Sequence, residues 1–220
     1  MWSRDSFFAV HNWWHLALYH LENGDIGKVL ALFDGPIYGA RSPLILELLD
    51  ATAMLWRLHL RGIDVGDRWQ LVANGWEPVA DAGTYAFNDM HAAMAFVGAG
   101  RTQSLARVLD AQMSAMAQPN DNAGFTREVG NPVVRAIAAF GDGRPAETVS
   151  LLRDVRNIAH RFGGSHAQRD ILDLTLIEAA FRCDDQALTS ALVAERAALR
   201  PASPLSRLFL QRATRQLQAA

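Results

Sequence analysis

Cysteine is nearly absent from this sequence, since its 220 residues include only Cys183. One cysteine cannot form an intrachain disulfide, and this usage fits a reducing compartment. No histidine adjoins it in Phe-Arg-Cys-Asp-Asp, so we interpret it as a small half-buried hydrophobe. Apolar runs of the ~18–20 residues needed to span a bilayer are missing, and so is a secretion-signal pattern. These absences predict a cytoplasmic protein with no membrane partner.

Neither sign of charge is in large excess. The chain has 21 Lys and Arg against 23 Asp and Glu, which gives a net charge of −2 at pH 7. This balance provides no long-range field to attract nucleic acid, so we expect no nucleic-acid partner. Lys28 is the one lysine, so nearly all the basic residues are arginine, a preference that we attribute to genome composition. Residues 200–220 carry arginine without acid, and salt-dependent retention on heparin would reveal nucleic-acid binding there.

Strand patterns are missing as well, because Val, Ile and Thr nowhere alternate with polar residues over a sustained run. Apolar residues instead recur every three or four positions, as on one face of an α-helix. Trp13, Ala17 and Leu21 show this spacing in the first segment, and Val133, Ile137 and Phe140 show it in a later one. The sequence therefore predicts an all-α fold.

Turn residues interrupt these segments about every 40 residues, a period typical of helical repeats. They are Gly24-Asp25, Gly62, Gly100-Arg101, Gly143-Arg144 and Asp184-Asp185. A single hairpin cannot bury both of its faces, so neighbouring hairpins must stack. We predict one domain over residues 1–220, an α-α superhelix (solenoid) of about five tetratricopeptide-like hairpins plus a capping helix. The expected ranges are 7–35, 42–79, 85–118, 127–160 and 164–199 for the hairpins and 203–219 for the cap.

Local signals mark some helix starts. Ser165 follows two glycines and is the expected N-cap of the fifth hairpin. Ser203 and Pro204 are the expected N-cap and first turn of the final helix. The polar segment 118–124 is the longest expected loop.

Several motifs, in order and nearly end to end, resemble those of the tetratricopeptide repeat protein 38 family. They are His11-Asn-Trp-Trp-His15, Asp50-x3-Met54-Leu-Trp-Arg-Leu58, Gly66-Asp-Arg-Trp69, Phe87-Asn-Asp-x-His91, Gly163-Gly-Ser-His-Ala-Gln-Arg-Asp170 and Glu195-Arg-x-Ala-Leu-Arg-Pro-x-Ser-Pro204. The resemblance implies a tetratricopeptide-like superhelix and no established reaction. Family members are longer, and this chain is similar to their C-terminal half.

Unusual polar residues recur on the first helix of each expected hairpin. In a tetratricopeptide-like stack these first helices line the concave groove, and residues three, four or seven positions apart share a helix face. The groove is therefore a candidate binding site. Its predicted residues are His11, His15, Arg57, Asn88, Asp89, His91, Arg169 and Asp170. Structural pairing, such as Arg57 with Asp50 or Arg169 with Asp170, is the competing interpretation.

A metal centre and a catalytic triad are weaker interpretations. His11 and His15 have the spacing of two zinc ligands, but Asn12 stands where a zinc protease carries its glutamate base. Ser165 and His166 are adjacent, so on a helix their side chains diverge by ~100° and cannot form a nucleophile–base pair. We expect neither a metal nor another cofactor.

The leading hypothesis is a binding protein whose groove holds a peptide or small polar ligand. The alternative is an enzyme, with hydrolysis as its candidate reaction, that uses the groove histidines as acid–base groups. All six tryptophans precede residue 77, and Phe7 and Phe8 adjoin the first aromatic cluster. An apolar patch left uncovered there predicts self-association through the N-terminal hairpin.

Overall fold

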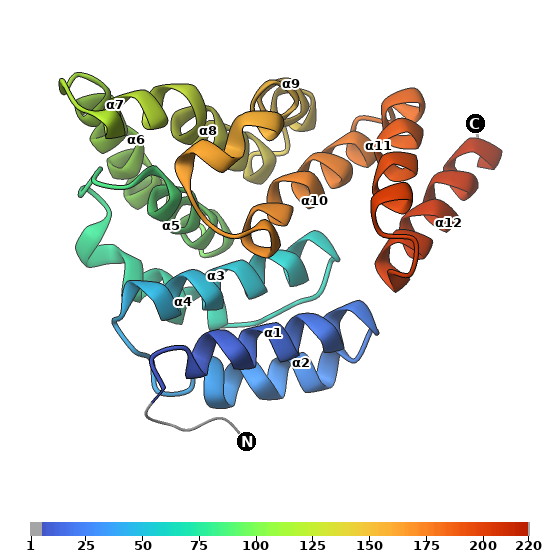
Figure 1. Ribbon diagram of the computed structural model, residues 1–220, viewed down its shortest axis with the longest axis horizontal. Helices are drawn as coiled ribbons and strands as arrows, with labels where there is room; N and C mark the ends of the chain where they lie inside the picture. Colours follow the sequence, from blue (N-terminus) through green and yellow to red (C-terminus); the bar gives the residue numbers. More distant parts are fainter. Residues whose placement is uncertain (1–5, 220) are drawn as a thin grey trace.

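The computed structural model describes residues 6–219, and every regular element in this range is helical, with no strand (Figure 1). Within this range, no helix combines the length and the apolar character needed to cross a membrane. The all-α prediction is confirmed. The helices are α1 (Ala9–Glu22), α2 (Ile26–Leu32), α3 (Ile45–Leu60), α4 (Arg68–Trp76), α5 (Ala86–Gly98), α6 (Thr102–Met116), α7 (Asp121–Phe125), α8 (Asn131–Gly141), α9 (Pro145–Val155), α10 (His166–Arg182), α11 (Gln186–Leu199) and α12 (Pro204–Ala219). Short π segments, Phe33–Ile37 and Thr126–Gly130, and 3-10 segments, Glu77–Val79 and Arg156–Phe162, adjoin them.

Successive helices pack in pairs across short turns. The pairs are α1 with α2, α3 with α4, α5 with α6, α8 with α9, and α10 with α11. Four of the predicted turns contain a glycine with a φ between 69° and 79°, and the fifth contains Asp184 with a φ of 55°. Glycine suits such positions because a side chain there would clash with the backbone. The predicted turn residues therefore lie where the chain reverses.

The first helices of neighbouring pairs lie side by side. Near the start of α1, His11 contacts Asp50 of α3, and near its end the Leu21 carbonyl accepts a hydrogen bond from Arg61, the residue that follows α3. These partners are 39 and 40 residues apart in the chain. Since both contacts advance in the same direction, α1 and α3 run parallel. Helix α5 then packs on α3, and α8 packs on α5.

Helix α10 departs from this order, because it packs against both α9 and α3 (Figure 1). The indole N–H of Trp56 in α3 donates to the Thr175 hydroxyl of α10 at 3.0 Å. The Trp56 ring also lies 5.6 Å from the Phe140 ring of α8. Apolar side chains therefore fill the space between α3, α8 and α10. Two of the first helices on which the sequence places a groove, α3 and α10, are thus in direct contact.

Two of the predicted helix starts are confirmed, and the predicted loop is wrong. Ser165 and Gln168 form a capping box at the start of α10, in which each side chain bonds the other's backbone. The Ser203 hydroxyl accepts the backbone N–H of Ser206 at the start of α12. The segment 118–124 contains the start of α7, because Asn120 caps the N–H of Ala123.

Four of the tryptophans are buried in the core. Trp14, Trp56 and Trp76 are fully buried, and Trp69 is nearly so. The Trp76 indole donates to Thr52 of α3 at 2.8 Å, which ties α4 to α3. Trp2 lies outside the described residues.

Gly98→Ala should destabilise the protein, because α5 passes directly against the Trp69 ring of α4. A methyl group at residue 98 would overlap atoms of that indole. We expect a loss of about 1–3 kcal/mol in the free energy of unfolding, measured with urea. Gly27→Ala in α2 is the matched control, since nothing lies within 4 Å of its added methyl group. That change should stabilise by up to about 1 kcal/mol. Equal stabilities for the two variants would contradict the α4–α5 packing.

Candidate functional site

Two of the predicted histidines form a chain of hydrogen bonds with a buried carboxylate. Asp50 of α3 is buried, and its oxygens lie 3.0 and 3.1 Å from Nδ1 of His11. A carboxylate only accepts hydrogen bonds, so Nδ1 of His11 carries a proton. Nε2 of His11 faces Nε2 of His15 at 3.2 Å, and His15 is exposed. The three groups therefore lead from the core to the surface.

The surrounding protein shifts the pKa values of these three groups in different directions. The hydrogen bond to Asp50 raises the pKa of His11 above its usual 6.5, although burial opposes it. Burial, followed by the charges of His11 and Arg57, lowers the pKa of His15. Burial raises the pKa of Asp50, and its bond to His11 opposes that shift. At neutral pH, His15 is therefore a neutral imidazole beside a more basic one.

Asp50→Asn should lower the pKa of His11, because it removes the carboxylate whose hydrogen bond favours the charged imidazole. The measurement is an NMR titration of the histidine ring protons. His59 is the internal control, since burial and Arg182 lower its pKa without any contribution from Asp50. A His11 pKa that does not change in the variant would contradict this contact.

Arg57 lies deeper, between α3 and the start of α10. It is 4% exposed, and it donates from Nη1 to the Ala53 carbonyl at 3.0 Å and from Nη2 to the Ala167 carbonyl at 2.6 Å. Its guanidinium also lies 5.4 Å from the Trp14 ring centre. No carboxylate of residues 6–219 forms an ion pair with it. Burial lowers its pKa to about 10, because the nearby charges, led by Asp170, offset that burial only in part.

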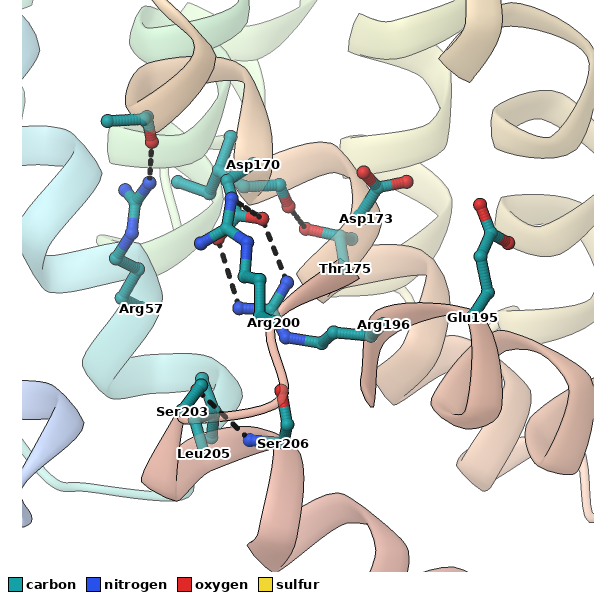
Figure 2. A network of polar contacts seen from close by, with 12 residues as sticks. Arg57, Asp170, Asp173, Thr175, Glu195, Arg196, Arg200, Ser203, Leu205 and Ser206 are labelled. Atoms are coloured by element: carbon teal, nitrogen blue, oxygen red, sulfur yellow. Dashed lines mark hydrogen bonds and ion pairs between the residues drawn. The ribbon is translucent and has the colours of Figure 1, made fainter. Parts of the chain in front are cut away.

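Asp170 belongs to a network formed with two arginines at the end of α11 (Figure 2). Arg196 approaches both of its oxygens, at 2.8 and 3.2 Å, and Arg200 lies 3.0 Å away. Burial alone would raise the pKa of Asp170, but these arginines, together with Arg57, hold it below its usual value. The predicted pairs Arg57–Asp50 and Arg169–Asp170 are therefore wrong.

The remaining predicted residues lie elsewhere. Arg169 donates to the carbonyls of Gly163 and Gly164 and so stabilises the turn before α10. The Nδ1 of fully buried His91 donates to the Phe87 carbonyl at 2.8 Å, and burial lowers the pKa of this histidine to about 4. Its Nε2 is buried and has no hydrogen-bond partner among the described residues.

Asp89, which follows a partly buried Asn88, faces α6 instead of the first helices. Gln112 donates to its carboxylate at 3.1 Å and accepts from Asn131 at 3.3 Å. Burial raises the pKa of Asp89 to about 6. Of the eight predicted residues, the structure therefore joins His11 and His15 by a hydrogen bond and places Arg57 and Asp170 at one cavity wall.

Arg57 and Asp170 line a partly open cavity of about 180 Å³. Its wall is formed by residues of α1, α3 and α10, by the residues that follow α3 and α11, and by the start of α12. Leucines 18, 21, 174 and 205 supply much of its wall, and Arg57, Arg61, Arg200, Glu22 and Asp170 are its charged residues. We call this space the α1–α3–α10 cavity. A larger hollow of about 600 Å³ lies between residues 81–84 and α6, but it is shallow and contains none of the predicted residues.

The described residues provide no metal centre, because no group of three or more His, Cys, Asp or Glu among them could hold an ion. Sequence reasoning missed Arg61 and Arg196. The period of about 40 residues could have indicated Arg61, since parallel neighbours in a repeat bring residues one period apart together. Arg196 carried no such signal, because it lies on a second helix.

No protein-family model matches the chain, and no solved structure matches it significantly.

Proposed function

We propose that the chain is a tetratricopeptide-like helical repeat protein, similar to the family named above, that binds a small polar ligand in the α1–α3–α10 cavity. The observation that carries this proposal is Arg57, a buried guanidinium at a cavity wall that donates to two carbonyls and lies over Trp14 but forms no ion pair among residues 6–219. An isolated buried charge is costly, and proteins rarely retain one without a partner of opposite charge or a role. The cavity brings that charge within reach of a guest molecule.

The size of the cavity favours a small molecule over a peptide. Its volume of about 180 Å³ is only slightly larger than the roughly 150 Å³ of an engineered cavity that binds benzene. Drug-sized ligands occupy roughly 300–1,000 Å³. Of the two ligand classes expected from the sequence, the small polar ligand is therefore the better match.

The test is a thermal-shift screen of the full chain against small carboxylates, phosphates, amines, alcohols and sugars. A ligand that binds only the folded state at 100 times its Kd adds about 2.7 kcal/mol of stability. We expect at least one class to raise the melting temperature, and the rise to be smaller in Arg61→Gln. A panel in which no compound changes the melting temperature, together with no co-purified molecule in native mass spectrometry, would reject a ligand-binding role.

A hydrolase remains the second candidate function, because the Asp50–His11–His15 chain has the order of an acid–base relay. Asp50 holds the proton on Nδ1 of His11, and the neutral His15 reaches solvent. This function predicts turnover of small esters that His11→Asn abolishes while the circular dichroism spectrum is unchanged. Activity that survives in His11→Asn would exclude the relay, and so would the absence of turnover in the wild type.

Self-association through the first hairpin is also a proposal. Phe7 and Phe8 are 73% and 55% exposed, and their rings contact each other. We expect a dimer whose dissociation is promoted by Phe7→Ser, measured by light scattering over a range of concentrations. A monomer mass at every concentration would exclude it.

A further inference from the structure

The charges around the α1–α3–α10 cavity are unequal. Three guanidiniums and two carboxylates line it. Asp170 pairs with Arg196 and Arg200, as Figure 2 shows. Glu22 accepts from two neutral donors, the Ser203 hydroxyl at 2.6 Å and the Leu205 N–H at 3.4 Å. Burial lowers the pKa of Arg61, and the charge of Glu22 opposes that shift. The wall therefore carries one guanidinium more than it has carboxylates.

Arg57 and Arg61 are the wall guanidiniums that form no ion pair with a carboxylate of residues 6–219. Arg57 lies in the last turn of α3, and Arg61 follows four positions later as the residue that ends the helix, so both lie on the same side of it. Arg57 donates only to two carbonyls, and Arg61 donates only to the Leu21 carbonyl, at 2.6 Å. A guanidinium has five N–H donors, so both retain donors for a ligand. These carbonyl bonds fix the two side chains at the wall before any ligand arrives.

Apart from Tyr19, the rest of the wall is aliphatic. Leu18 and Leu21 come from α1, Leu174 from α10, and Leu205 from the start of α12. A compact, doubly charged ion such as phosphate would leave these leucines facing a strongly hydrated group. An ion with one charged end and an alkyl tail would satisfy both parts of the wall, because alkyl groups gain free energy when they leave water.

We propose that the α1–α3–α10 cavity binds a short-chain aliphatic carboxylate, with its carboxylate between Arg57 and Arg61 and its tail against the leucines. Arginine pairs well with carboxylates because its planar fork can donate two parallel hydrogen bonds. The cavity volume allows a molecule a few atoms larger than benzene, which corresponds to a chain of about six carbons. This inference rests on the proposed ligand-binding function and specifies its ligand.

The experiment is isothermal titration calorimetry of the full chain with acetate, butyrate, hexanoate and octanoate. Affinity should rise about fourfold for each added methylene up to hexanoate, because each buried CH₂ contributes a similar free energy. It should fall for octanoate, whose tail exceeds the cavity. Hexanol and hexylammonium, which have the same tail without the negative charge, should bind at least about tenfold more weakly than hexanoate.

Arginine variants test whether the carboxylate of the ligand binds between Arg57 and Arg61. Arg61→Gln should weaken hexanoate about tenfold or more, because it removes one charge-assisted contact. Arg153→Gln, which makes the same charge change at an exposed residue of α9, should leave the affinity unchanged. Arg57→Gln is the stronger test if it folds, and Arg61→Gln keeps the proposal testable if it does not.

The outcomes separate the two proposals. Tighter binding of hexylammonium, hexanol or phosphate than of hexanoate would overturn the carboxylate inference and leave the ligand-binding function standing. Equal loss of hexanoate affinity in Arg61→Gln and Arg153→Gln would show binding through general charge, and would also overturn it. Failure of every compound in the thermal-shift screen would overturn both.

Discussion

Trp56→Ala should lower the free energy of unfolding by about 3–5 kcal/mol, the range observed when a large aromatic side chain is removed from a core. Trp56 is fully buried, and its indole bonds Thr175 of α10 while its ring contacts Phe140 of α8. The residue therefore joins three helices that are far apart in sequence. Removing it leaves a cavity where the stack closes on itself. Urea unfolding followed by circular dichroism measures the change.

Met113→Ala provides the control for this experiment. Met113 is a large apolar residue of α6 that is 61% exposed, so its truncation should change stability by less than about 0.5 kcal/mol. Trp56→Phe, which keeps a ring and removes the N–H donor, should fall between the two. If Trp56→Ala costs no more than Met113→Ala, then α10 does not pack on α3 as described.

The helices and their turns were predictable from the sequence because local patterns determine them. Apolar spacing of three and four residues identifies a helix face, and a glycine such as Gly62 marks a reversal. The same local logic identified Ser165 as a helix cap, which the capping box confirms. It failed at residues 118–124, where a polar composition typical of loops also suits the capped first turn of α7.

The return of α10 to α3 was not predictable in the same way. It depends on side chains more than 100 residues apart, such as Trp56 and Thr175, whose contact has no local signature. This return explains why the predicted site was only partly assembled. It places Arg57 and Asp170 at the wall of one small cavity, whereas His91 is buried and bonds to its own helix. The sequence therefore indicated which polar residues to examine, but the partners of these residues depended on the packing of α10 against α3.

The second large effect concerns the carboxylate that this closure buries. Asp170→Asn should destabilise the protein by about 3–5 kcal/mol at neutral pH, the range seen when one partner of a buried ion pair is removed. Asp170 is 10% exposed, and it neutralises Arg196, which is 6% exposed. Asparagine has a similar shape but no charge, so Arg196 would remain buried without a counterion. Urea unfolding of both proteins at pH 7 measures the difference.

The pH dependence of this difference identifies its electrostatic origin. The arginines hold the pKa of Asp170 below its usual 3.8 in the folded protein. A lowered folded pKa adds stability above pH 3.8, and that stability is lost as the pH falls through the folded pKa. The gap between wild type and Asp170→Asn should therefore be constant near neutrality and shrink below pH 3.8. Asp142→Asn is the matched control, since Asp142 is 60% exposed in its pair with Arg144 and should contribute less than about 1 kcal/mol. A gap that is independent of pH would assign the loss to packing, and a gap no larger than that of Asp142→Asn would show that Asp170 does not neutralise the buried arginines.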